Sequence, residues 1–194
     1  MIFFLINETS FAQEGFKWAK HYSDPGARSQ VAYDVVTDAN GNVYITGLNS
    51  NGYSVNDMVT IKYSSSGKYK WGKTFNTSSE YTGEVGKSIA LYKNGTKSYV
   101  YVAGEVAFSG LTQYIKIIKY DESGNEKWQK EFDPGVPGSS DFVAKVTADT
   151  LGNCYIAGYS ANKAFGAKYD SSGNVIYTNL INMPTGYSLS LIHI

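Results

Sequence analysis

A repeat of about 50 residues is the feature that most constrains the fold of this chain. Its first block combines a turn, a strand-like run and a closing glycine, and it occurs at residues 38–47, 94–104 and 149–158. Its second block carries Lys-Tyr near its start and ends on an aromatic residue, at residues 61–71, 118–128 and 167–177. Such a period is typical of propellers and solenoids, in which each unit buries its apolar face against its neighbours.

Each unit is predicted to contain four short strands. In the first unit these are residues 31–37, 42–47, 57–63 and 68–75, where Val, Ile, Tyr and Thr are frequent. Asn40-Gly41 predicts a tight hairpin, because both central residues of such a turn tolerate positive φ. No segment keeps the apolar spacing of a helix over two turns, so we expect no substantial helix. The predicted fold class is all-β, with four-stranded propeller blades.

The two blocks together resemble the bacterial β-propeller repeat called SBBP. The resemblance rests on Gly41-Asn-Val-Tyr-Ile-Thr-Gly47, on Lys62-Tyr63-x-x-x-Gly67-x-x-x-Trp71 and on their copies, which extend it over residues 16–180. The sequence departs from the pattern in the lengthened turn of the middle copy, in Cys154 at a Val position and in Tyr177 at a Trp position. This resemblance implies a β-propeller of secreted and surface proteins of bacteria, which often belong to long multidomain chains.

The repeat also divides the chain. We expect the closing strand of a preceding blade plus a loop at residues 13–30, blade 1 at 31–75, blade 2 at 76–133 and blade 3 at 134–188. Because closed propellers have about four to eight blades, about three blades predict an incomplete, open propeller with unpaired edges. The leading strand around Trp18 is either a closing strand that completes the last blade or the remainder of an earlier blade.

Both ends of the chain stand apart from the repeat. Residues 1–12 are largely apolar and end in Ser10-Phe11-Ala12, a small-x-small tripeptide typical of a secretory signal peptide; a hydrophobic first strand is the alternative. Residues 189–194 match the translation of a common sequencing adapter, and we interpret them as an artefact at the end of a truncated gene. A genuine apolar strand is the alternative there. The leader predicts a secreted or cell-surface location.

One aromatic residue closes each unit, namely Trp18, Trp71, Trp128 and Tyr177. A large flat side chain at one position per unit is expected to fill the gap between neighbouring blades. The alternative is an exposed surface on which sugars stack. For the tyrosines in predicted loops, both interpretations remain open: Tyr22, Tyr53, Tyr81 and Tyr187.

Candidate chemistry is sparse. His21 and His193 are the only histidines and cannot build a histidine-based metal centre, and Cys154 lies in an apolar strand pattern typical of an inert buried thiol. Residues 38–42 resemble a calcium loop weakly, but a hairpin explains them better. The Asp133-Pro-Gly segment reads as a loop, since no helix follows it to bind phosphate. We therefore nominate no catalytic, cofactor-binding or metal-ligating residue.

Composition narrows the classes of function. The chain has 194 residues, of which 17 are basic and 17 acidic, so its net charge of zero argues against a nucleic-acid partner. No apolar run reaches the roughly 18 residues that a membrane span needs, and a single cysteine excludes an internal disulfide framework.

The function predicted from these features is a non-catalytic secreted or cell-surface module. It would act as a scaffold or as a binding platform for extracellular protein or polysaccharide, and would also contact the remaining blades of its own chain. The main alternative is a fragment of a propeller-type enzyme or carbohydrate-binding protein, which a charged lining of the propeller axis would favour. A purely structural spacer is a third possibility.

Overall fold

The computed structural model describes residues 18–20, 22, 28–50, 52, 56–77, 82–108 and 113–183. These residues form twelve strands and no helix. The first blade contains β1 (Ser29–Thr37), β2 (Val43–Ser50), β3 (Asn56–Tyr63) and β4 (Tyr69–Phe75). The second contains β5 (Thr82–Asn94), β6 (Lys97–Phe108), β7 (Gln113–Asp121) and β8 (Glu126–Phe132). The third contains β9 (Asp141–Ala148), β10 (Cys154–Ser160), β11 (Lys163–Tyr169) and β12 (Val175–Asn182).

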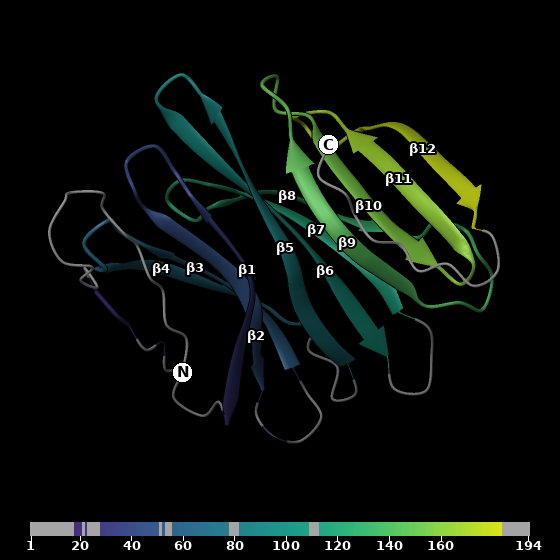
Figure 1. Ribbon diagram of the computed structural model, residues 1–194, viewed down its shortest axis with the longest axis horizontal. Helices are drawn as coiled ribbons and strands as arrows, with labels where there is room; N and C mark the ends of the chain where they lie inside the picture. The colour runs from purple at the N-terminus through teal and green to yellow at the C-terminus, as the bar shows by residue number, and fades with distance from the viewer. Residues whose placement is uncertain are drawn as a thin grey trace, which may run out of the picture.

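Every blade is an antiparallel meander in which each strand pairs with the next one along the chain. The first two blades are also linked by one parallel bridge, between Asn56 and Gly83. Figure 1 shows the three blades fanned side by side, with β1–β4 on the left and β9–β12 at the upper right. The all-β, open-propeller prediction is confirmed, and the four strands predicted for the first unit match β1–β4 to within a few residues.

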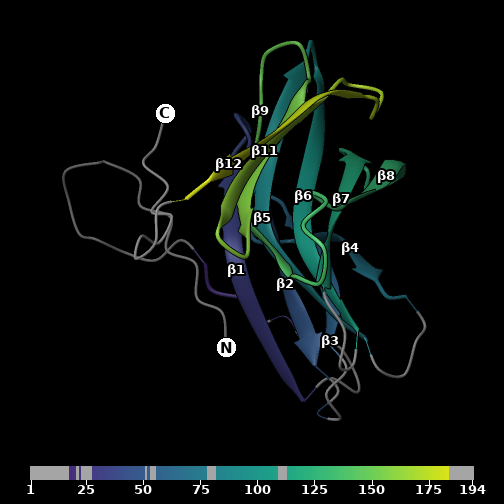
Figure 2. The same ribbon diagram turned by 90° about the vertical axis from the view of Figure 1, so that its right-hand side faces the viewer.

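The blades meet along their first strands. β5 contacts both β1 and β9, so β1, β5 and β9 are the inner strands of the arc. Figure 2 shows the order outward from them: β1 and β5 lie on one side, and β4 and β8 lie on the other. Because β12 pairs only with β11, it forms the outer edge of the third blade.

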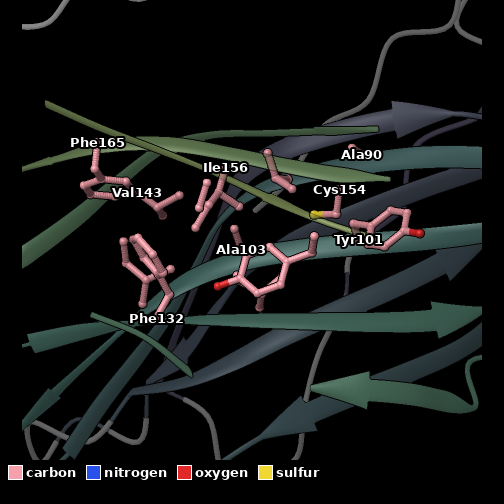
Figure 3. Packing of buried hydrophobic residues seen from close by; sticks show 13 residues of the cluster. Ala90, Tyr101, Ala103, Phe132, Val143, Cys154, Ile156 and Phe165 are labelled. Carbon is pink, nitrogen blue, oxygen red and sulfur yellow. The ribbon is translucent and has the colours of Figure 1, made fainter. Parts of the chain in front are cut away.

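The apolar core fills the spaces between blades. Between the second and third blades, Tyr101 and Phe132 face Ile156 and Phe165, and the rings of Phe132 and Phe165 lie 5.1 Å apart (Figure 3). Strands β6 and β7 are buried on both faces because a blade covers each side of them, as in the fully buried run of residues 100–106. These two strands of the middle blade therefore have a continuous apolar sequence pattern, which is typical of strands with neither face exposed to solvent.

Tryptophans close the joints between blades, as their recurrence predicts. Trp71 is 9% exposed and its ring lies between those of Tyr44 and Tyr120, at 6.1 Å from each. Trp128 occupies the same place in the next joint, between Tyr101 at 5.8 Å and Tyr169 at 6.3 Å. The prediction that the closing aromatic fills the gap between blades is confirmed for Trp71 and Trp128, whose sugar-stacking alternative is not supported. It does not hold for Tyr177, which is 43% exposed because no described blade covers β12.

Candidate functional site

The inner turn of the first blade is a hairpin stabilised by Asp38. Its Oδ1 accepts the backbone N–H groups of Asn40 and Asn42 at 2.9 and 3.0 Å. Its Oδ2 accepts the amide of Asn42 at 2.8 Å and the hydroxyl of Tyr44 at 3.1 Å. Burial opposes ionisation of this carboxyl, but the hydrogen bonds outweigh it and lower the pKa of Asp38. The hairpin interpretation of residues 38–42 is thus supported over the calcium loop, since protein donors surround the carboxylate.

The geometry of this turn differs from the predicted one. Gly41 has φ of +75°, whereas Asn40 has a negative φ. Gly41 N–H donates to the carbonyl of Asp38, and Asp38 N–H donates to the carbonyl of Asn42. The connection is therefore a type I turn followed by a left-handed glycine, not a two-residue turn with two positive φ angles. The predicted hairpin is confirmed, and only Asn40 departs from the expected positive φ, because the Asp38 carboxylate binds its N–H and holds it in an ordinary turn conformation.

The corresponding hairpin of the second blade is longer. Strands β5 and β6 extend beyond the neighbouring inner turns and are joined by Gly95-Thr96, where Gly95 has φ of +59°. Tyr92 and Tyr99 are partners across this extension, and their rings stack at 6.0 Å. The extension is the lengthened turn that distinguishes the middle copy of the repeat.

A cleft of about 340 Å³ lies between this extended hairpin and the Asp38 turn. Its lining combines one aromatic ring with hydroxyl, amide and ammonium groups, contributed by Thr37, Asp38, Ala39, Asn40, Leu91, Tyr92, Lys93, Thr96 and Ser98. This volume is at the lower end of the range for small-ligand sites. An aromatic face beside polar groups can take a planar or a sugar-like ligand through stacking and hydrogen bonds.

Charged side chains join the inner strands of the three blades. Each inner strand has a bulge, and Asp34, Ser88 and Lys145 follow these bulges in β1, β5 and β9. Asp34 Oδ2 accepts hydrogen bonds from Ser88 Oγ at 3.0 Å, from Ile89 N at 2.9 Å and from Lys145 Nζ at 2.9 Å. Burial opposes ionisation of Asp34, but these hydrogen bonds outweigh it and hold its pKa below the usual 3.8.

A second charged pair lies close by, between Lys87 of β5 and Glu105 of β6. Their charged atoms are 3.5 Å apart, and Glu105 Oε1 also accepts the N–H of Val143 at 3.2 Å. Burial raises the pKa of Glu105, although the charge of Lys87 opposes that shift. Charged groups of the kind that would favour an enzyme therefore lie on the inner strands and on the neighbouring β6, and Asp34, Lys145, Lys87 and Glu105 all bond across or within blades.

The sequence did not reveal these charged groups. Asp34, Ser88 and Lys145 occupy equivalent places, but they are chemically different, so no recurring residue type marks the position. Glu105 follows the glycine that closes the first block, where the other two blades have Leu48 and Tyr159. A search for places where charge interrupts the repeat would have found both groups.

The other sequence candidates have simple structural roles. Cys154 is fully buried, and burial raises the pKa of its thiol to about 12, as expected for an inert cysteine. Asp133 accepts the N–H of Gly135 within a loop. Tyr22 packs beside the apolar cluster of Val43 and Ile45. Several predictions lie outside the described residues: the leader at 1–12, the adapter-like segment at 189–194, His21, His193, Tyr53, Tyr81 and Tyr187.

Two further observations concern the described part of the chain only. It contains no helix of a length and hydropathy suited to crossing a membrane. Within the same residues, no three His, Cys, Asp or Glu side chains come together as a metal-ligating group.

Part of the repeat matches a known protein family. Residues 135–166 match the family described as SBBP, beta-propeller repeat. No curated protein matches the chain. A protein of unknown function from Bacteroides caccae is similar at a TM-score of 0.53 and 10% identity, over 88% of this chain and 51% of that one. At that identity the likeness concerns the fold alone.

The beta-propeller domain of Nup133 from Vanderwaltozyma polyspora is similar over 88% of this chain and 54% of that one. Its identity is 8% and its TM-score is 0.41. The chain thus spans about half the length of both structures. The described residues thus form an open β-propeller of three four-stranded meanders, and residues 135–166 of it match the SBBP beta-propeller repeat.

Proposed function

We propose that this chain is a non-catalytic binding platform of a secreted or cell-surface protein, and that it binds through the cleft beside the β5–β6 hairpin. The observation that supports this is the break in the repeat itself. The extended hairpin is the element in which the middle blade departs from its neighbours, and it forms one wall of the cleft. Non-repeated loops on a rigid repeat scaffold are where binding residues concentrate.

The chemistry of the cleft favours a polysaccharide or a polar peptide segment as its ligand. Tyr92, whose ring stacks on Tyr99, contributes an apolar part of the lining, and Asn40, Thr96 and Ser98 offer donors and acceptors beside it. The Asp38 carboxylate is already bonded to four protein donors, so it fixes the wall and leaves recognition to its neighbours.

A binding screen tests the proposal. The full chain is applied to arrays of bacterial and host polysaccharides and of extracellular proteins, beside Ser98→Trp, which fills the cleft. Leu151→Ser serves as the matched control, because Leu151 is a 74% exposed residue of the inner turn of the third blade. We expect a ligand whose signal Ser98→Trp abolishes and Leu151→Ser keeps. Absence of any ligand, or equal loss in both variants, would contradict the proposal.

The secreted location rests on residues 1–12 and has a separate test. When the chain is expressed in a bacterial host with its leader, we expect cleavage after Ala12 and a mature chain that begins at Gln13 outside the cytoplasm. Mass spectrometry of the purified protein measures this end directly. An intact leader on a cytoplasmic protein would contradict the location and leave the binding proposal intact.

One observation favours an enzyme as the second candidate, namely the buried Glu105 beside Lys87. A carboxyl whose pKa is raised by burial is suited to donating a proton. If this pair is catalytic, a panel of glycoside and ester substrates will show turnover that Glu105→Gln removes without lowering the urea midpoint. If the pair is structural, Glu105→Gln will change the urea midpoint and no turnover will be found.

A further inference from the structure

The extended β5–β6 hairpin brings positive charge to the cleft beside it. Residues 91–99 include two lysines and no acidic residue. Lys93 lines the cleft, and its cross-strand partner is Ser98, another residue of the lining. Leu91, two residues earlier on the same face of β5, packs against the apolar cluster between the first two blades. The Lys93 side chain therefore projects from the hairpin on the side of the Asp38 turn.

The Lys93 ammonium has no partner of opposite charge among the described residues. Within that part of the chain it takes part in no ion pair, hydrogen bond or ring contact. Two other lysines of the same blade are engaged, since Lys87 pairs with Glu105 and Lys116 pairs with Glu131. The cleft therefore holds a positive charge that the described residues leave unbalanced.

Asp38 is the acidic residue of the lining, and its carboxylate is already satisfied. Four protein donors bind it, two at each oxygen. Its charge is also balanced by Lys62: burial lowers the pKa of Lys62, and the nearby charges of Asp38 and Glu122 oppose that shift. The outer turn of the second blade, which joins β7 and β8, holds Lys62 in place, because Lys62 Nζ donates to the carbonyl of Glu122 at 3.0 Å. The lining thus offers a ligand no carboxylate in need of a donor.

The neutral polar side chains of the lining can all donate hydrogen bonds. Asn40 contributes an amide, and Thr37, Thr96 and Ser98 contribute hydroxyl groups. None of these side chains is bonded to another described residue, because the bonds of Asn40 and Ser98 involve their backbone N–H groups. An ammonium beside amide and hydroxyl donors suits an anionic oxygen group, since a charge-assisted hydrogen bond is about twice as strong as a neutral one.

The uncharged part of the lining favours a sugar over a peptide. Its hydroxyl groups can each donate and accept, which matches the hydroxyls of a sugar ring. Its aliphatic side chains are those of Ala39 and Leu91, a small surface for the apolar anchors that hold most peptides. At about 340 Å³ the cleft has room for a sugar ring with a charged substituent. It therefore suits one acidic sugar of a longer chain that continues into solvent.

We propose that the cleft selects acidic polysaccharides, and that the Lys93 ammonium binds the carboxylate or sulfate group of one sugar. This inference rests on the proposed function of the cleft and adds the charge of its ligand. The Asn40 amide and the Ser98 hydroxyl donate to the same group or to neighbouring ring oxygens. The selectivity originates in the lengthened turn of the middle copy, because Lys93 belongs to the extension that the inner hairpins of the other blades lack.

Matched pairs of polysaccharides test the charge directly. Titration calorimetry of the full chain compares polygalacturonate with its methyl-esterified form, and a sulfated galactan with its unsulfated form, so that the two sources of charge are separated. We expect at least one charged form to bind, and Lys93→Met to weaken that binding by about tenfold or more. Lys93→Arg should keep most of the affinity, and high salt should reduce it. Lys127→Met, at an exposed position of β8, is the matched control and should bind like the unmodified chain.

Other outcomes separate this inference from the proposed function on which it rests. Equal binding of charged and neutral forms, or equal affinity of Lys93→Met and Lys127→Met, would overturn the inference. The cleft would remain a binding site if Ser98→Trp still abolished the binding observed. If a polyglutamate peptide binds more tightly than both charged polysaccharides and loses as much in Lys93→Met, the ligand is an acidic peptide and the inference is likewise overturned. If no polysaccharide and no peptide binds, the inference and the proposed function fail together.

Discussion

Single residues set the backbone of the turns on which the blades depend. Most turn residues with positive φ are glycines, and the exception in the described chain is Ala161, at φ of +50° in the turn between β10 and β11. The left-handed conformation costs a non-glycine residue about 1–2 kcal/mol. Glycines under tryptophan rings carry a second constraint, since the ring leaves no room for a side chain.

Replacing Ala161 by glycine is expected to stabilise the protein. The change removes the cost of the left-handed conformation in the folded protein. The greater entropy of glycine in the unfolded chain offsets part of that gain, so the free energy of unfolding should rise by about 0.5–1 kcal/mol. Urea unfolding measures it. Ala157→Gly, in the middle of β10, is the matched control and should lower stability by a similar amount. Equal effects of the two changes would show that the φ of Ala161 is not the cause.

Replacing Gly173 by alanine is expected to destabilise the protein more than the same change at Gly135. Both glycines have positive φ, at +85° and +79°. A Cβ at Gly173 would meet the ring of Trp128 at 2.9 Å, whereas a Cβ at Gly135 would have no heavy atom within 4 Å. The difference in free energy of unfolding should be about 1–3 kcal/mol, the cost of overpacking. Equal losses would mean that the ring moves aside freely.

Secondary-structure elements interact mainly through their strand ends and edges. Outer strands of the first two blades carry a tryptophan to the next blade, while inner strands exchange charged hydrogen bonds such as those at Asp34. The two kinds of contact lie at opposite ends of the blade, so each blade is held to its neighbour at its inner and outer edges. The apolar clusters fill the space between.

Replacing the closing aromatic by alanine should cost more stability where the ring is buried between blades than where it is exposed. We expect Trp71→Ala to lower the free energy of unfolding by about 3–5 kcal/mol, because it removes a ring packed between two tyrosines and its bond to Glu122. Tyr177→Ala in the same chain should cost less than about 0.5 kcal/mol, since no blade covers that ring. Thermal or urea unfolding of both variants checks the contrast. Similar losses would mean that Tyr177 is already buried in solution.

The Asp34 contact between inner strands predicts acid sensitivity. Because the pKa of Asp34 is lower in the folded protein than its usual 3.8, its stabilising effect is complete above that value and is lost as pH falls through the folded pKa. Asp34→Asn should cost about 1–3 kcal/mol at pH 7 and much less near pH 2. Urea midpoints at both pH values measure the difference, with Glu126→Gln at an exposed position of β8 as the control. Parallel pH profiles for Asp34→Asn and the unmodified chain would contradict this assignment.

The whole molecule is an arc with two different ends. At one end Trp18 covers the outer turn of the first blade, as a preceding blade would, and at the other the outer strand β12 is exposed along its full length. Ile176 and Leu180 of β12 stand where the second blade has Lys127 and Glu131. An apolar edge strand with free backbone groups is prone to pair with other chains.

Charging this edge is expected to keep the chain monomeric. The double variant Ile176→Lys, Leu180→Glu gives β12 the side chains of β8 at the equivalent positions and leaves Tyr177 and Ile181 unchanged. Light scattering at rising concentration should show less association than in the unmodified chain, with an unchanged urea midpoint. Unchanged association would mean that the chains associate through another surface, such as the exposed Val31 and Val35 of β1.

The sequence predicted those features that every blade shares. The second block revealed the outer turn and the closing aromatic, because one joint requires the same lysine, glycine and ring each time. The inner contact of Asp34, Ser88 and Lys145 stayed hidden, since three different side chains meet there only after folding. The lengthened turn of the middle copy was visible, but the cleft depends on how that hairpin lies beside the Asp38 turn. The hairpin at Asn40-Gly41 was predicted correctly, but the ordinary φ of Asn40 depends on its bond to the Asp38 carboxylate.

The direction of the tryptophan joints has a consequence for synthesis. Trp18, Trp71 and Trp128 bind carbonyls that lie 47, 51 and 43 residues later in the chain. A blade emerging from a ribosome or an export channel therefore cannot seat its closing ring until almost one more unit has followed it. At about 5–20 residues per second, each ring stays unseated for several seconds. During that interval the newest blade is the one most open to proteases and chaperones, and completion passes along the chain one unit behind its growing end.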